Sequence, residues 1–114
     1  MRAVVLGTGL LVLGTAARAH TVSADEVVAQ LRAPALREAY GIVDVHRLDG
    51  LPRLLLVQVG ERWRDVPAEQ RRAAAEEWAV TWQHAVPQGI VSVVDGEGDA
   101  VVNFDALGGA RLTH

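Results

Sequence analysis

Hydrophobic and polar positions follow two different periods along this chain, and the change of period divides it into helices and strands. Over residues 24–40 the apolar side chains recur at helical spacing. Ser23 and Glu26 form the S-x-x-E pattern of a capping box, which predicts that a helix follows directly. Pro34 either breaks this helix or opens a second short one, and Gly41 is a typical residue to end the helical stretch.

From residue 42 the period changes to two, which is typical of strands. Segments 42–48 and 53–59 flank an Asp-Gly pair and predict an antiparallel hairpin. Segments 90–94 and 100–104 flank a turn with two glycines and predict a second hairpin.

A longer helix is predicted between the two hairpins. Pro67 suits a first helical position, and residues 73–86 are rich in strong helix formers. Trp78 and Trp82 lie one helical turn apart on the apolar side, so they are expected in the core.

The element order is therefore helix, hairpin, helix, hairpin, an αββ unit used twice over about residues 23–59 and 61–104. The fold class predicted is α+β: a four-stranded antiparallel sheet with the helices packed on one face. Residues 20–107 form one domain, and residues 108–114 are expected to be a flexible C-terminal tail.

Strand alternation assigns residues to the two faces of this sheet. The purely apolar set, in which Val43 accompanies Val45, is expected under the helices. The other face mixes polar and apolar side chains, which is typical of a contact surface for a homodimer, a partner protein or a small apolar ligand. Its candidate binding residues are Asp44, His46, Leu54, Leu56, Gln58, Ile90, Ser92 and Asn103, with Val94 and Val101 on the same side. The alternative is that the tail or the turn near Pro34 covers them.

The N-terminus has the pattern of a secretory signal peptide. A basic start is followed by an apolar run over residues 3–16 and by an A-x-A sequence at residues 17–19, immediately before His20. The run is short for a membrane span. The sequence thus predicts a periplasmic or secreted protein with no stable membrane anchor after cleavage. The absence of lysine, with much Ala, Val, Arg and Gly, is typical of a high-GC bacterial genome.

Charge and cysteine content exclude several classes of partner and chemistry. The 14 acidic residues exceed the 11 basic ones, and cleavage would also remove Arg2 and Arg18. Without a basic stripe, nucleic acid is not expected as a partner. The chain has no cysteine, which excludes a disulfide framework, a thiol nucleophile and a lipidated cysteine.

Few residues have a pattern that indicates chemistry. His20, as a new N-terminal residue, together with Asp44 and His46 on one strand face, would offer ligands for copper or zinc, and this is the alternative function. Asp95, Glu97 and Asp99 lack the spacing of a calcium loop and are expected to be a solvated turn.

No hydrolase motif is present, since the chain has no G-x-S-x-G sequence and no ordered triad. A small secreted enzyme is therefore the third candidate function, after a binding module and a metal-binding protein. The preferred prediction is a non-catalytic binding or accessory module without a cofactor, whose partner is a protein or a second copy of the chain.

Overall fold

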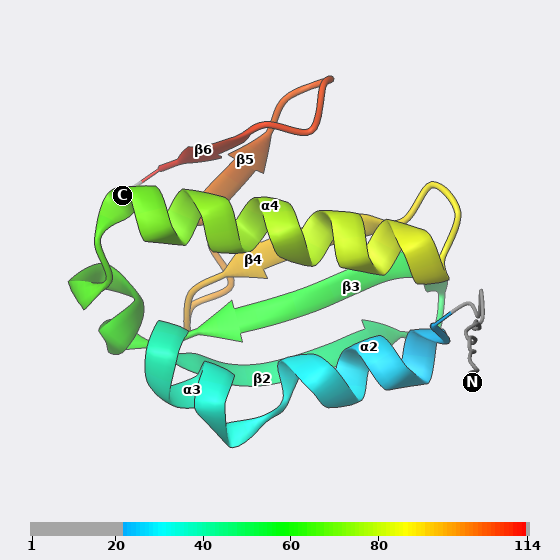
Figure 1. Cartoon of the computed structure of the whole chain (residues 1–114), viewed down its shortest axis with the longest axis horizontal. Helices are drawn as coiled ribbons and strands as arrows, with labels where there is room; N and C mark the ends of the chain where they lie inside the picture. The colour runs from blue at the N-terminus through cyan, green and yellow to red at the C-terminus, as the bar shows by residue number, and fades with distance from the viewer. Residues whose placement is uncertain (1–21, 114) are drawn as a thin grey trace, which may run out of the picture.

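The computed structural model describes residues 22–113, which form an α+β domain. Its elements are α2 (Ala24–Leu31), α3 (Pro34–Tyr40), β2 (Ile42–Leu48), β3 (Leu51–Val59), the 3-10 helix η1 (Glu61–Asp65), α4 (Ala68–Ala85), β4 (Ile90–Val94), β5 (Val102–Phe104) and β6 (Ala110–Leu112) (Figure 1). The predicted signal peptide and His20 lie outside the described residues. Within residues 22–113, no helix is both long and apolar enough to cross a bilayer.

The helix boundaries follow the local sequence signals. Ser23 Oγ accepts from the N–H of Glu26 at 3.1 Å, and the Glu26 carboxylate accepts from the N–H of Ser23 at 2.8 Å. The predicted capping box is therefore confirmed. Pro34 begins α3, and Gly41 ends it in the left-handed region with φ +74°.

The larger sheet has three strands in the order β2-β3-β4. The β2–β3 hairpin is antiparallel, as predicted, but β4 runs parallel to β3, with Leu55 opposite Val91 and Val57 opposite Val93. The prediction of a four-stranded antiparallel sheet is wrong. Its physical cause is α4, a helix of 18 residues that returns the chain to the end of the sheet where β3 began.

The second predicted hairpin forms only at its turn. Segments 90–94 and 100–104 meet at a single bridge, Val94 with Ala100, and then β5 pairs with β6 in a separate two-stranded sheet. Residues 108–114 were expected to be a flexible tail, yet residues 110–112 form β6. Burial explains both corrections, because Val102 and Ala110 join the main core and the N–H of Ala110 donates to Glu76 of α4 at 2.7 Å.

The core lies between the sheet and the helices, which all cover the same side of the three-stranded sheet (Figure 1). Trp82 is fully buried, and its indole N–H donates to the carbonyl of Arg53 at 2.8 Å. The apolar sheet residues predicted under the helices are buried, including Val45, Leu55, Val57, Val59, Val91 and Val93.

Several residues depart from the predicted faces, and Ala100, expected under the helices, is exposed. Val43 is 45% exposed, because the β2–β3 register shifts between Ile42 and Asp44 and Ile42 takes the buried position instead. Val94 and Val101 were expected on the open side, yet both are buried, at 8% and 4% exposure. They flank the point where the chain turns out of the sheet towards β5.

Candidate functional site

The strand register brings most of the predicted binding residues together on the side of the sheet away from the helices. His46 lies opposite Leu56, and Leu56 lies opposite Ser92. Asp44 lies opposite Gln58, and Leu54 opposite Ile90. We call this surface the open face; it comprises Asp44, His46, Leu54, Leu56, Gln58, Ile90 and Ser92. Asn103 is exposed on β5, in the other sheet, and does not belong to it.

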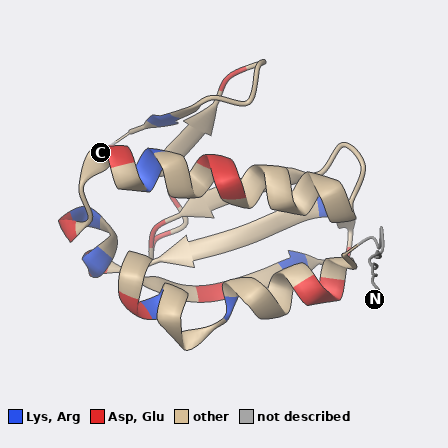
Figure 2. Ribbon diagram, viewed as in Figure 1, with Lys and Arg blue, Asp and Glu red and all other residues tan. Residues whose placement is uncertain are grey.

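The open face consists of half-buried polar and apolar side chains and one strongly exposed apolar residue. Ile90 is 52% exposed, whereas the other six residues are half-buried. Figure 2 shows that charged residues lie mainly on the helices and turns, while β3 and β4 carry few of them. The face therefore offers contact area rather than a charged site.

One polar pair on the open face is ordered. His46 Nδ1 lies 2.9 Å from Asp44 Oδ2. An ionised carboxylate only accepts hydrogen bonds, so this pairing places a proton on Nδ1 and leaves Nε2 as the nitrogen with a lone pair in neutral imidazole. The pair is oriented as a metal-binding histidine often is.

Further metal ligands do not gather around this pair. Over residues 22–113, the only group of three or more His, Cys, Asp or Glu side chains close enough to hold an ion is Asp95, Glu97 and Asp99. Asp95 Oδ1 there accepts from the N–H groups of Glu97 and Asp99, at 2.9 and 3.0 Å, so the carboxylate stabilises its own turn.

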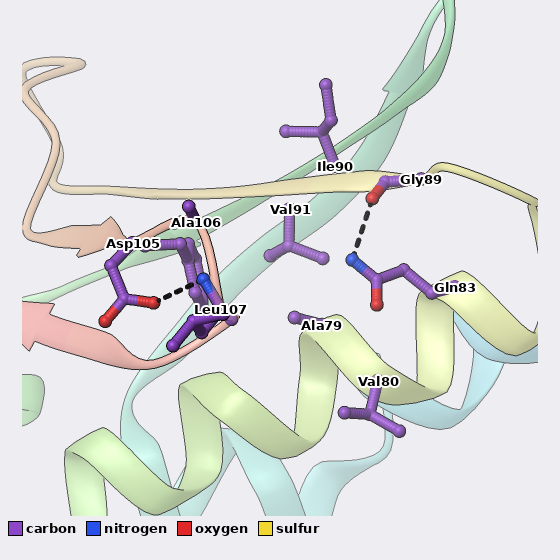
Figure 3. Close-up of a pocket in the computed structure, with 11 residues that line it drawn as sticks. Ala79, Val80, Gln83, Gly89, Ile90, Val91, Asp105, Ala106 and Leu107 are labelled. Atoms are coloured by element: carbon purple, nitrogen blue, oxygen red, sulfur yellow. Dashed lines mark hydrogen bonds between the residues drawn. The ribbon is translucent and has the colours of Figure 1, made fainter.

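A cavity of about 310 Å³ lies beside β4, and sequence reasoning missed it. It is lined by Ala79, Val80 and Gln83 of α4, by residues 89–91, and by residues 104–108 (Figure 3). We call it the wedge cavity, because the chain after β4 returns to that strand at the single Val94–Ala100 bridge and then diverges into β5. Ile90 and Val91 point to opposite sides of β4, so Ile90 connects this cavity to the open face.

Exposed apolar side chains concentrate around the wedge cavity. Among the residues that the structure describes, six large hydrophobic side chains are exposed, and three of them line it: Val80 at 50%, Ile90 at 52% and Leu107 at 96%. A fourth, Leu51 at 53%, lines a neighbouring cavity of about 210 Å³ together with Ile90. Patches of this kind mark association or ligand sites.

Leu107 occupies the tip of a turn that repeats an earlier one. Asp95 and Asp105 each accept two main-chain N–H bonds on Oδ1, and Gly98 and Gly108 both have φ +88°. The third turn position is Glu97 in one copy and Leu107 in the other. This D-x-x-G repeat was a signal available in the sequence, and it marks Leu107 as an apolar residue where its counterpart is acidic.

Comparison of the chain with protein-family models, with curated proteins and with solved structures finds no match. The function of this protein must therefore be inferred from the site alone.

Proposed function

We propose that this protein is a small exported binding or accessory module without catalytic activity, and that it contacts its partner through the open face and the adjoining wedge cavity. The observation that carries the proposal is the clustering of Leu51, Val80, Ile90 and Leu107 around two cavities that meet at Ile90. Isolated exposed apolar residues are ordinary, whereas contiguous ones mark contact sites.

Export is part of the proposal and rests on the signal-peptide pattern of residues 1–19. The expected location is the periplasm or the outside of a bacterial cell. The expected occupant of the surface is a partner protein, or a second copy of the chain, since the acidic composition gives no basis for nucleic acid binding.

Site-specific photo-crosslinking in the source cells tests the proposed surface. Benzophenone-bearing residues replace Ile90 and Leu107 in two variants, and Val43 in a matched control, because Val43 is also exposed and apolar but lies on the other edge of the sheet. Mass spectrometry identifies the adducts. We expect the same protein, or a second copy, from both test positions and not from the control. No common adduct, or the same adduct from Val43, would contradict the proposal.

The second candidate function is copper or zinc binding through His20 and His46, and the Asp44–His46 pair favours it. Calorimetric titration of the cleaved protein with copper(II) and zinc tests this candidate. It requires that His46→Ala weakens binding at least tenfold, while His84→Ala, at an exposed histidine of α4, does not. Equal heats for the two variants would exclude it.

A further inference from the structure

The outward edge of β4 is hydrogen-bonded at its two ends and open between them. The carbonyl of Gly89 accepts from Gln83 Nε2 at 3.2 Å, and the carbonyl of Val93 accepts from the N–H of Val101 at 2.9 Å. Asp95 donates its N–H to Asp99 on the same edge. Because alternate residues of a strand direct both main-chain groups to the same edge, residues 89, 91, 93 and 95 all face away from β3.

Val91 lies between Gly89 and Val93, whose carbonyls both have a partner. Its N–H and C=O face the wedge cavity, which Val91 lines, and no hydrogen bond within residues 22–113 uses either group on that side. Buried main-chain groups are nearly always paired. Val91 therefore presents one donor and one acceptor beside a cavity, in the arrangement that a neighbouring strand would pair with.

We propose that an extended segment of a partner polypeptide enters the wedge cavity and pairs with Val91 as an added strand of the sheet. A main chain in extended conformation presents an N–H and a C=O at the spacing of those on Val91, and this is the recognition mode called β-augmentation. The cavity volume of about 310 Å³ is at the lower end of ligand cavities, roughly 300 to 1,000 Å³, so the inserted segment is short.

The lining of the cavity defines the side chains of this segment. Val80 and Leu107 offer apolar contacts, and Asp105 is the one charged side chain among the lining residues. The whole chain is acidic, with a formal net charge of -3. By charge complementarity, the partner segment carries apolar residues at alternate positions and a lysine or arginine beside them.

This inference rests on the proposed function, because it describes how the same surface holds its partner. The probe is the blocked peptide Lys-Val-Thr-Val-Thr-Val-Lys and its analogues with Leu, Ile or Phe at the central position. Two N-methylated forms provide the control: one is methylated on the amides of the apolar residues and the other on those of the threonines. Only one of these two sets faces β4 in an added strand.

Titration into ¹⁵N-labelled protein provides the readout. We expect the amide signal of Val91 to shift and its hydrogen exchange to slow on binding. One N-methylated form should bind at least tenfold more weakly, and the other within about threefold of the parent peptide. The proposal would be overturned if neither the parent peptide nor any of its three analogues bound at 5 mM. A dissociation constant of 5 mM corresponds to a binding free energy of roughly −3 kcal/mol.

Two outcomes separate this inference from the broader function. In the first outcome, the peptide shifts the NMR signals of Val80 and Leu107 but not that of Val91, and both N-methylated forms bind equally well. This result would overturn strand addition but would still support the contact surface. In the second outcome, crosslinking at positions 90 and 107 gives no common adduct, and this result would contradict the proposed function itself. Val80→Asn should abolish peptide binding and Val43→Asn should not, because both side chains are exposed and only Val80 lines the cavity.

Discussion

The two edge strands of the three-stranded sheet, β2 and β4, differ in how their outward main-chain groups are hydrogen-bonded. On the β2 edge, Arg32 Nε donates to the carbonyl of Val45 at 2.9 Å, and Arg37 donates to the carbonyl of Val43 at 3.3 Å. The edge is also bent by the register shift near Ile42. On the β4 edge, Gln83 closes one end, and Asp99 and Val101, which precede β5, close the other, so that Val91 is left open. Soluble proteins normally blunt exposed edges, so the open one is a candidate for function.

The largest change in stability is expected from disrupting the two-stranded sheet of β5 and β6, which lies on one side of the wedge cavity. Val102→Asp places a carboxylate at a position that is 4% exposed in the core, and we expect the free energy of unfolding to fall by about 3 kcal/mol. Asn103→Asp, at the exposed neighbour, should change it by less than about 0.5 kcal/mol. Urea denaturation measures both. Equal effects would show that Val102 does not contribute to the core.

Opening the closed edge is the next test. Arg32→Ala leaves the half-buried carbonyl of Val45 without its donor, and we expect a loss of about 1 kcal/mol in stability. The double variant with Arg37→Ala should associate in a concentration-dependent way, as seen by light scattering, because a second edge is then exposed. Arg64→Ala, an exposed arginine of η1, is the control. A double variant that stays monomeric and fully stable would mean that the arginines do not protect this edge.

Extending the open edge gives a smaller change. Gln83→Ala frees the carbonyl of Gly89, so the open segment grows towards the start of β4. We expect stability to fall by about 0.5 to 1 kcal/mol, and the peptide Lys-Val-Thr-Val-Thr-Val-Lys to bind at least as tightly as to the original protein. Gln70→Ala, exposed in the first turn of α4, serves as the reference. Tighter binding to the Gln70 variant would argue against this edge.

The smallest stability effect belongs to the turn tips. Leu107→Gln should change the free energy of unfolding by less than about 0.5 kcal/mol, because the side chain is 96% exposed, yet it should weaken peptide binding severalfold. The matched substitution in the equivalent turn, Glu97→Gln, should change neither quantity, since Glu97 lies outside the wedge cavity. Peptide affinity that is insensitive to Leu107→Gln would remove Leu107 from the contact surface.

Local signals in the sequence predicted much of this fold. The capping box at Ser23, the helix around Trp78 and Trp82, and the period of two in residues 53–59 each depend on neighbours a few residues apart. Most of the open face followed from the same alternation, and the register placed its residues side by side.

The parts that escaped prediction depend on contacts between distant elements. The direction of β4 was decided by the path of α4, and β5 left the sheet because Val102 and Ala110 join the main core, with the N–H of Ala110 bonded to Glu76 of α4. Neither event has a local signature in the sequence. The wedge cavity is a consequence of that departure, so the alternation that defined the open face gave no indication of it.

Residue-resolved hydrogen exchange of the isolated protein tests the open edge most directly. The N–H of Val91 faces the wedge cavity, whereas that of Ser92 faces the ladder with β3. We predict that Val91 exchanges markedly faster than Ser92 in the free protein, and that the added peptide slows Val91 but not Ser92. Equal protection of the two amides in the free protein would contradict the account.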